Sequence, residues 1–280
     1  MTNNINEIDK LNNISFLLRK KIIDISYQTK AHHIGSELSC IDILVALYYN
    51  IMNVDPNEPT KKVRDFFILS KGHAALALYV TLMNRGFFSE NYLMKEFISD
   101  GGKLGGHPDK NIPLGIEIST GSLGHGLSIG AGIALANKKD KNPSKTFVLL
   151  GDGECNEGMI WEASLFASHQ KLDNLIAIID YNKLQGFGST TDILDLYPLK
   201  EKFQSFGWNT KEVNGHDITS IINTTNKMFA EKNKPNLLIA NTIKGKGITS
   251  MENKFESHYE VLDEAKYLEI IKNYKLTKDI

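Results

Sequence analysis

Two side chains that could bind a metal ion follow two apolar runs near the centre of the chain. Asp152 comes just after the run at 147–150, and Asn182 comes shortly after the run at 175–179. Such runs are typical of parallel strands buried on both faces, and a crossover of this length normally contains a helix. Ligands of open parallel sheets bind beyond the carboxyl ends of the strands, so both side chains could face one point. A carboxylate, an amide oxygen and a nearby backbone carbonyl are ligands that Mg²⁺ or Ca²⁺ accepts.

Glycine on either side of Asp152 lets the backbone approach a bulky anion. On its own, the motif Gly151-Asp152-Gly153 is most often an ordinary turn between a strand and a helix, because short motifs also match by chance. Its combination with Asn182, beyond a second strand, favours a binding site.

Histidines that directly follow glycine form a second group of candidate residues. Four of the eight histidines do so, and a single Gly-His pair is most often a turn with a solvated imidazole. Several such pairs on loops that leave strand ends favour a shared site, where imidazoles can bind phosphate oxygens or carry protons to sugar hydroxyls. No Cys/His cluster has the spacing of a zinc site. The four histidines are His73, His107, His125 and His216.

Composition limits the class of protein. With 280 residues, 41% of them hydrophobic, the chain can bury a full core, and we expect one domain over 1–280. A net charge of −1 with interspersed signs makes nucleic acid an unfavoured partner. We expect no membrane span, because no apolar run approaches the necessary length. The N-terminal residues lack the apolar core of a signal peptide, which favours the cytoplasm. Cys40 and Cys155 are expected to be buried and unpaired.

The remaining pattern predicts an α/β fold, with a parallel sheet flanked by helices on both faces. Apolar spacings of three and four predict a helix over 5–29, and Ser39 could cap a second helix. Other helices are expected to end near Gly86, to follow His125 with Gly130 and Gly132 in close packing, to run from Asp217 to about Lys232, and to begin near Leu262. A loop is expected over 186–198, before a short helix. The candidate strands end near Leu69, Leu150, Ile179, Val213 and Ala240.

Taken together, these motifs resemble those of thiamine diphosphate enzymes. GDG followed at this distance by Asn is similar to the signature of that cofactor class, and the string GDGECNEGMIWEA with the later DYNKLQ resembles the transketolase family. The resemblance covers nearly the whole chain and corresponds to the N-terminal, pyrophosphate-binding half of a transketolase. The matching positions, in order, are His33, Ser70 to His73, Gly105 to Pro108, Thr120 to Gly124, Gly151 to Gly153, Asn182 and His258.

The resemblance implies a role for each matching residue. It places the divalent cation, Mg²⁺ or Ca²⁺, on Asp152, Asn182 and the Leu184 carbonyl. It places thiamine diphosphate against His73, Gly121, Leu123, Gly151, Asp152, Gly153, Glu154, Asn182 and His258. It makes His33, His73, His107 and His258 the residues of the sugar channel, and Glu157 an acidic residue at the subunit interface that supports catalysis.

The resemblance further implies transfer of a two-carbon ketol unit from a ketose, by default a sugar phosphate, to an aldose. The cofactor would act as the electron sink. In this family a glutamate on the following pyrimidine-binding domain activates the cofactor. We therefore expect a separate chain to carry the pyrimidine-binding and C-terminal domains, and the active enzyme to be a heterotetramer.

Two readings stay open beside this one. The chain could be the α subunit of a 2-oxo acid dehydrogenase or resemble deoxyxylulose-phosphate synthase, although decarboxylation does not need several sugar-facing histidines. It could also be a non-catalytic partner subunit. A departure from the family pattern concerns the substrate: His32, Ile34 and Glu37 surround the first matching histidine, where the family usually has Gly-His-Pro-Gly, so the sugars could be unusual.

Overall fold

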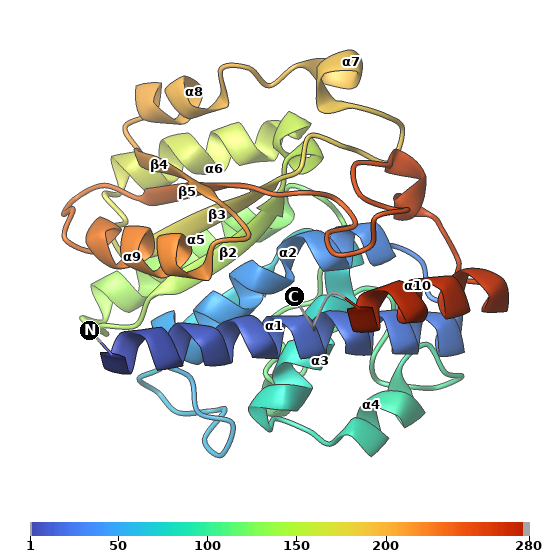
Figure 1. Ribbon diagram of the computed structural model, residues 1–280. Coiled ribbons are helices and arrows are strands. Elements are labelled where there is room, and N and C mark those ends of the chain that lie inside the picture. Colours follow the sequence, from blue (N-terminus) through green and yellow to red (C-terminus); the bar gives the residue numbers. More distant parts are fainter. Residues whose placement is uncertain (1, 277–280) are drawn as a thin grey trace.

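A parallel sheet of five strands forms the centre of the computed structural model (Figure 1). The strand order is β1-β2-β3-β5-β4, and every neighbouring pair is parallel. The structure describes residues 2–276, and the side chains of 7–274. The ends of the expected domain over 1–280 therefore lie outside the described residues.

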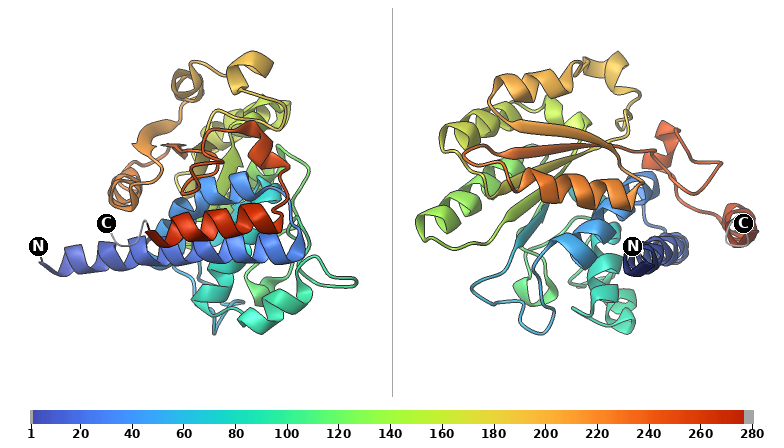
Figure 2. Two further views of the ribbon diagram at one scale, coloured as in Figure 1. Left: turned by 45° about the vertical axis from the view of Figure 1, so that its right-hand side comes forward. Right: turned by 60° about the vertical axis from the view of Figure 1, so that its left-hand side comes forward.

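Helices alternate with the strands along the chain and cover both faces of the sheet (Figure 2). Short 3₁₀ turns occupy Gly72–Ala74, Ile112–Leu114, Gly153–Asn156 and Phe255–His258, and one π-helical turn, Leu47–Ile51, extends α2. The strands are β1 Phe66–Leu69, β2 Thr146–Gly151, β3 Leu175–Tyr181, β4 Asn209–Asn214 and β5 Asn236–Asn241. The helices are α1 Thr2–Thr29, α2 Ile34–Ala46, α3 Ala75–Arg85, α4 Glu90–Glu96, α5 His125–Lys139, α6 Gly158–His169, α7 Thr190–Leu194, α8 Leu199–Ser205, α9 Ile218–Met228 and α10 Glu264–Leu276.

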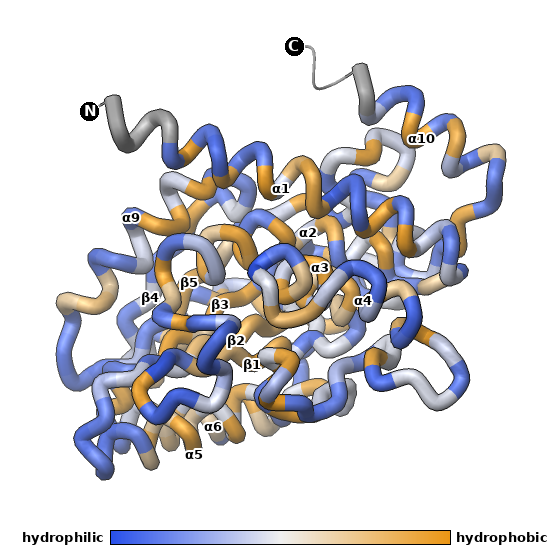
Figure 3. The backbone as a smooth tube through the Cα atoms, turned by 90° about the horizontal axis from the view of Figure 1, so that it is seen from below, coloured by the Kyte–Doolittle hydropathy of each residue, from blue (hydrophilic) through white to orange (hydrophobic). Residues whose placement is uncertain are grey.

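The strands β1, β2, β3 and β5 are mostly apolar because both of their faces are buried, whereas the edge strand β4 is polar and half exposed. Successive side chains of β2 alternate between two cores: Phe147 and Leu149 pack with α1, α2, α3 and α9, whereas Val148 and Leu150 pack with α5, α6 and α8. A strand buried on both faces needs this pattern, since its side chains alternate with a period of two. The hydropathy-coloured tube shows the hydrophobic residues gathered in the sheet (Figure 3).

The first and last helices lie side by side across one face of the protein (Figure 1). The ring of Phe16 stacks on that of Tyr274 at 4.5 Å, and Tyr27 stacks on Tyr267 at 4.2 Å. Each stacked pair adds to the apolar area that α10 buries. The C-terminal segment is thereby fixed to α1, which in turn packs on α2.

The predicted architecture is confirmed, and the strands end within two residues of the expected positions. Asp217 caps α9 by accepting from the Ser220 amide at 3.0 Å, and Gly86 ends α3 with φ of 92°. Cys40 and Cys155 are both buried and free. The helix after Asp217 ends at Met228 rather than near Lys232.

Four details of the prediction were wrong or incomplete. Ser39 does not cap α2, because the helix already begins at Ile34, after His33 in a left-handed conformation; the Ser39 hydroxyl instead donates to the Ser36 carbonyl and to Asp180. The loop at 186–198 contains α7. The helix α4 was not predicted at all. The small residues of α5 were expected to pack against a sheet or another subunit; an added Cβ at Gly132 would meet nothing within 4 Å, so for this glycine only packing against another subunit stays a prediction.

The expectation about apolar runs was also wrong. The helical stretch Ile34–Ile51 is long and apolar enough to cross a membrane by length and composition, the single such stretch among the described residues. However, 83% of its residues are buried inside the protein. It packs between α1, α3 and the sheet, which is the environment of a core helix.

A buried ion pair joins the ends of three strands to α2. The Lys71 ammonium follows β1 and pairs with the Asp180 carboxylate of β3, and their side chains are 1% and 0% exposed. Thr242, after β5, and Ser39, in α2, also donate to Asp180. Burial opposes both charges, but the pKa of Lys71 is raised because Asp180 lies beside it, and the pKa of Asp180 is lowered by Lys71. Both groups are therefore charged at neutral pH.

Two glycines of α5 provide a matched test of the packing. A Cβ at Gly130 would clash with Val148, so Gly130→Ala should lower the free energy of unfolding by about 1–3 kcal/mol. Gly132→Ala should raise it by about 0.5–1 kcal/mol, because alanine is the better helix former and the position is open. Urea unfolding of each variant measures both values. Equal effects at the two positions would contradict the packing described for Gly130.

The ion pair can be tested by removing one partner and then both. Lys71→Met leaves the Asp180 carboxylate buried without a cation, which should cost about 3–5 kcal/mol of unfolding free energy. The double variant Lys71→Met/Asp180→Leu should recover much of this loss because no isolated charge remains. Urea unfolding at pH 7 measures both variants. A loss below about 1 kcal/mol in the single variant would show that the pair is not needed for the fold.

Candidate cofactor and metal site

A cavity of about 420 Å³ opens at the carboxyl ends of β2 and β3. Most of the residues predicted from the sequence line it, and they come from five separate segments. The predicted residues that line the cavity are His73, Leu123, Gly151, Asp152, Gly153, Glu154, Glu157, Asn182, Leu184 and His258. The other three, His33, His107 and Gly121, are not part of its lining and lie beside it: His33 adjoins His73 and His258, and Gly121 adjoins His107.

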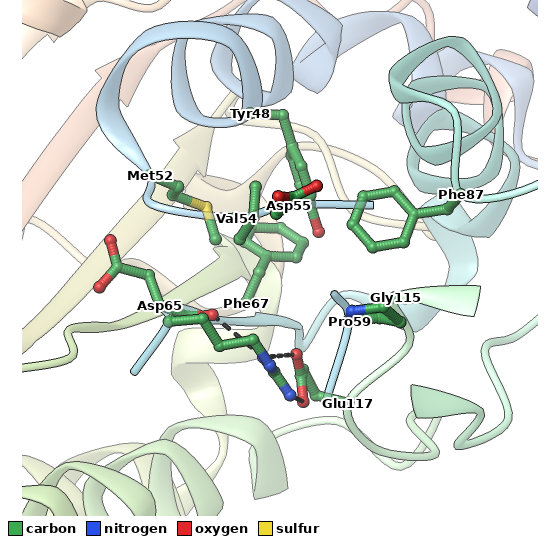
Figure 4. A pocket seen from close by; sticks show the side chains of 11 residues that line it. Tyr48, Met52, Val54, Asp55, Pro59, Asp65, Phe67, Phe87, Gly115 and Glu117 are labelled. Carbon is green, nitrogen blue, oxygen red and sulfur yellow. Dashed lines mark hydrogen bonds and ion pairs between the residues drawn. The ribbon is translucent and has the colours of Figure 1, made fainter. Parts of the chain in front are cut away.

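A second cavity, at the opposite ends of the strands, is too small to bind a cofactor (Figure 4). Its volume is about 10 Å³, room for about one water molecule. Tyr48, Phe67 and Phe87 surround it, and the ion pair between Arg64 and Glu117 lies on one side. It is a packing gap at the start of β1.

The three candidate metal ligands lie on two neighbouring loops. Asp152 follows β2 and is 3% exposed; its Oδ1 accepts from the Gly153 amide at 2.7 Å, and its Oδ2 accepts from the Lys183 amide. Asn182 follows β3, and its Oδ1 accepts from the Leu184 amide at 3.1 Å. The Leu184 carbonyl accepts from the Lys244 ammonium at 3.3 Å. The hydrogen bond from the Lys183 amide to Asp152 thus joins the two loops, and all three residues line the cavity at the corner that these loops form.

This corner fits a divalent cation. The buried Asp152 carboxylate takes part in none of the ion pairs found among residues 7–274. Burial, with the neighbouring Asp180 charge, raises the pKa of Asp152 to about 6, so a cation would relieve an unfavourable charge. The described residues contain no group of three or more His, Cys, Asp or Glu side chains that could hold a metal. An amide and a carbonyl oxygen would have to complete the set, which suits Mg²⁺ or Ca²⁺ better than zinc.

The glycines beside Asp152 differ in how closely their surroundings pack. A Cβ at Gly153 would lie 2.7 Å from the Gln185 side chain, which would have to move to admit any other residue. A Cβ at Gly151 would make ordinary contact with Lys71 at 3.7 Å. Gly153 lines the cavity, and its amide donates to Asp152 Oδ1 at 2.7 Å, so the glycine leaves room for an anion to approach beside the carboxylate.

Glu154 lines the cavity, but both of its oxygens are occupied by the protein. Oε1 accepts from the Ser70 hydroxyl and from the Gly124 amide at 2.8 Å, and Oε2 accepts from the Gly151 amide at 3.0 Å. Burial raises the pKa of Glu154. The side chain therefore joins the loops after β1 and β2 to the start of α5. Glu157, by contrast, is exposed at the rim.

Four histidines meet beside this corner. The ring of His33 lies 5.0 Å from that of His258, 5.6 Å from that of His73 and 5.9 Å from that of His107, measured between centroids. Burial, followed by His107, lowers the pKa of His33 to about 4, and burial, followed by Lys244, lowers the pKa of His258 to about 3. Burial also lowers the pKa of His73. At neutral pH these three imidazoles are uncharged and can donate or accept hydrogen bonds.

The backbone holds His33 in place through an unusual conformation. Its φ is 73°, in the left-handed region that few residues other than glycine adopt. The His33 amide donates to the His258 carbonyl at 3.0 Å, and its own carbonyl accepts from Ser36 and Glu37. His32 is exposed, and its Nδ1 lies 3.0 Å from the Tyr259 carbonyl. Two distant segments are thus tied together where their histidines meet.

Several lining residues were missed from the sequence. Lys244 is the most informative of them: it is 2% exposed, and its ammonium lies 3.3 Å from the Leu184 carbonyl and 2.9 Å from His258 Nδ1. Burial, with the nearby Lys71 charge, lowers the pKa of Lys244 to about 8. Its place just after the last strand was a usable signal, since polar groups after strands were the basis of the other assignments. The other lining residues that were not assigned from the sequence are Ser36, Lys71, Asn156, Gln185, Gly186, Phe187, Ile193, Leu194 and Tyr259.

Of the four Gly-His histidines, His73 lines the cavity and His107 lies beside it, whereas the other two lie elsewhere. His125 is exposed, and its Nδ1 lies 3.1 Å from the carbonyl of Leu123. His216 lies against Asp42 and the Ile243 amide. The shared site therefore contains His73 and His107 from this group, together with His33 and His258.

The chain is similar to proteins of known family. Residues 11–278 match the family model described as "Transketolase, thiamine diphosphate binding domain". The chain is 45% identical over 256 residues to an apulose-4-phosphate transketolase subunit of Phocaeicola vulgatus, covering 91% of this chain and 90% of that protein. It is 39% identical over 248 residues to a 6-deoxy-6-sulfo-D-fructose transketolase subunit of a Clostridium species, covering 89% of this chain and 90% of that protein.

Solved transketolases share the fold. The structure matches the transketolase of Campylobacter jejuni with a TM-score of 0.89 and 32% identity, over 98% of this chain and 43% of that one. It matches a Pichia stipitis transketolase solved with sedoheptulose 7-phosphate with a TM-score of 0.86 and 30% identity, over 96% and 41%. The chain thus spans about 41–43% of these solved proteins. The family predicted from the sequence is confirmed: the chain belongs to the transketolase family and corresponds to its thiamine diphosphate-binding domain.

Proposed function

We propose that this chain is the thiamine diphosphate-binding subunit of a two-chain transketolase, which transfers a two-carbon ketol unit from a ketose to an aldose. One observation carries the proposal: the cavity beyond β2 and β3 joins a buried carboxylate, without an ion pair among the described residues, to four clustered histidines. The two-chain organisation is supported by coverage. About 90% of this chain and about 90% of the relatives named as subunits match each other, whereas single-chain transketolases are matched over less than half their length.

The diphosphate end of the cofactor would lie in the cavity with its cation. Asp152, Asn182 and the Leu184 carbonyl would hold Mg²⁺ or Ca²⁺, since all three residues line one cavity and offer oxygen ligands. Gly153, His73, His258 and the Lys244 ammonium would contact the phosphates. Gly121 and Leu123 would lie toward the ring that follows. When bound, thiamine diphosphate supplies the electron sink that breaking a carbon–carbon bond next to a carbonyl requires.

The histidines would bind and orient the sugar. Because His33, His73 and His258 are uncharged at neutral pH, each can donate a hydrogen bond to a hydroxyl. His33 and His73 can also accept one, whereas Nδ1 of His258 already accepts from the Lys244 ammonium. His107 is exposed beside His33 and would face the wider part of the channel. The low pKa values keep His33, His73 and His258 uncharged, which limits their repulsion of the neighbouring lysines and leaves their rings able to form hydrogen bonds with substrate hydroxyls.

A partner chain would complete the site. Apolar side chains stand exposed along the rim of the cavity and the segment that follows it: Phe187 is 84% exposed, Tyr197 is 76% and Leu194 is 58%. Large exposed apolar groups gathered on one segment are typical of interaction surfaces. A chain that carries the pyrimidine-binding domain would cover them, and two copies of each chain would form a heterotetramer.

The names of the relatives support a class of donor. Apulose 4-phosphate and 6-deoxy-6-sulfo-D-fructose are both ketoses that carry an anionic group away from the carbonyl. We extend this class to the chain: its donor would be a ketose with a phosphate or a sulfonate. His32 and Tyr259 stand at the entrance beside His33 and would contact the part of the sugar that varies among donors.

Asp152→Asn tests the metal assignment. Removing the carboxylate should abolish the rise in melting temperature that Mg²⁺ with thiamine diphosphate gives to the assembled enzyme, because one charged ligand is lost. Without metal, the change in melting temperature should be small, because removing the buried charge offsets the loss of one of the two acceptors for the Gly153 and Lys183 amides. Thermal unfolding with and without ligand measures both effects.

Asp140→Asn is the control, because Asp140 is exposed at the end of α5 and far along the chain from the metal corner. It should leave the response to the ligand unchanged. An unchanged response in Asp152→Asn as well would remove the metal from this corner.

The two-chain organisation is tested by reconstitution. The chain alone should show no transfer between a ketose phosphate and an aldose phosphate in the presence of thiamine diphosphate and Mg²⁺. Addition of a chain that carries the pyrimidine-binding and C-terminal domains should restore transfer, seen by mass spectrometry as products shortened and lengthened by two carbons. Transfer by the single chain would contradict the need for a partner, and a complex that binds the cofactor without transfer would contradict the enzyme assignment.

A further inference from the structure

His216 lies outside the cavity but is hydrogen-bonded to the segment that carries Lys244. We propose that His216 is a positioning residue, which holds the loop after β5 so that the Lys244 ammonium stays at the cavity wall. The inference rests on the proposed function, in which Lys244 contacts the cofactor phosphates. His216 itself touches neither the cavity lining nor the metal corner.

The two ring nitrogens of His216 have different partners. Nδ1 lies 2.7 Å from Asp42 Oδ2, and the Ile243 amide donates to Nε2 at 2.8 Å. A backbone amide can only donate, so Nε2 must carry a lone pair, and the proton must sit on Nδ1, where it is donated to Asp42. A single uncharged tautomer satisfies both contacts. The imidazole thus acts as a rigid link between α2 and the loop.

Asp42 is itself fixed from the other side. Its carboxylate is 4% exposed and accepts from the Ser15 hydroxyl and the Arg19 guanidinium, both on α1. Burial opposes its charge, but Arg19 and the hydrogen bonds outweigh burial and lower the pKa of Asp42. A charged acceptor held by α1 and α2 therefore sets the orientation of the His216 ring. The chain of contacts runs from α1 through α2 to the loop beside the cavity.

The turn before His216 interlocks with the same loop. A Cβ at Gly215 would clash with the Thr242 side chain, and the Gly215 amide donates to the Asn241 carbonyl at 2.7 Å. This close approach brings His216 to the Ile243 amide. The end of β4 and the end of β5 are thus joined by a backbone hydrogen bond and by the hydrogen bond between the Ile243 amide and the His216 imidazole.

The loop that His216 holds carries Lys244, whose ammonium lies at the cavity wall. Lys244 directly follows Ile243, and its ammonium lies within hydrogen-bonding distance of the Leu184 carbonyl and His258. The Gly245 amide donates to the Gly35 carbonyl at 2.9 Å, which fixes the other side of Lys244. With Gly245 held by Gly35 and Ile243 held by His216, the Lys244 backbone is anchored on both sides. Loss of the His216 anchor should let the ammonium leave the wall.

Two substitutions separate the two hydrogen bonds of His216, the one to Asp42 and the one from the Ile243 amide. His216→Asn can still donate to Asp42 from its short amide but cannot reach Ile243. His216→Gln is longer, and its amide oxygen can accept from the Ile243 amide in place of Nε2. Comparing the two variants therefore distinguishes loss of the hydrogen bond that anchors the Lys244 loop from a general loss of packing. His169→Asn is the control, because His169 is exposed at the end of α6.

Three readouts follow each variant. Amide hydrogen exchange of Ile243 in the isolated chain reports the anchor itself, and acetylation of Lys244 at pH 8, read by mass spectrometry, reports the position of the ammonium. The dissociation constant of thiamine diphosphate with Mg²⁺ in the reconstituted enzyme reports the consequence. In His216→Asn all three should change by about tenfold, the effect of losing one buried hydrogen bond of this kind. In His216→Gln and His169→Asn each should stay within about twofold.

Equal changes of the three measurements in His216→Asn and His216→Gln would overturn the inference, because they would indicate that His216 has a general packing role. Unchanged exchange at Ile243 in His216→Asn would overturn it as well, and so would faster exchange with unchanged labelling of Lys244. If the native complex fails to bind thiamine diphosphate, the proposed function fails. The exchange and labelling results then still decide whether His216 positions Lys244.

Discussion

The buried pair of Lys71 and Asp180 is the constraint on which the site depends. The charges lie at the carboxyl ends of β1 and β3, and hydroxyls from α2 and from the loop after β5 donate to the same carboxylate. Two charges can be buried so deeply only when each is paired and hydrogen-bonded. The pair therefore requires these segments to meet, and the meeting point is the floor of the cavity. The geometry of the cavity floor is therefore set by the pairing and hydrogen bonding of these two buried charges, and does not depend on a bound ligand.

Beside the cavity, the backbone of His33 adopts an unfavourable conformation that brings histidines together. His33 has a positive φ, which is costly for a residue with a side chain, and the hydrogen bond from its amide to the His258 carbonyl compensates. This contact places rings from the two ends of the chain 5.0 Å apart. The stacked rings that hold α10 on α1 stabilise the C-terminal segment that follows His258. Burial then keeps both imidazoles uncharged, so the chemistry of the cluster derives from tertiary packing.

Much of the fold and part of the site could be predicted from the sequence. The strands were found because parallel strands buried on both faces read as continuous apolar runs, and Asp152 and Asn182 were found because they follow such runs. Ser39 was misassigned because a cap and an interior serine look alike until the start of the helix is known. Both Lys71 and Lys244 follow strands, which is a usable signal, but their burial was not predicted because nothing local shows that a lysine will be buried. Their role depends on contacts with residues far along the chain, and on carboxylates whose positions only the folded sheet determines.

The balance of charge explains why the cavity suits a metal-bound diphosphate. Asp180 neutralises Lys71, which leaves the Asp152 carboxylate and the Lys244 ammonium facing the cavity with no partner of opposite charge in direct contact among the described side chains. Burial disfavours both charges, and it raises the pKa of Asp152 to about 6 and lowers that of Lys244 to about 8. A cation beside Asp152 and an anion beside Lys244 would each remove an unfavourable charge. A ligand that carries both at once, such as a diphosphate with its divalent cation, relieves the two together, which neither ion alone would do.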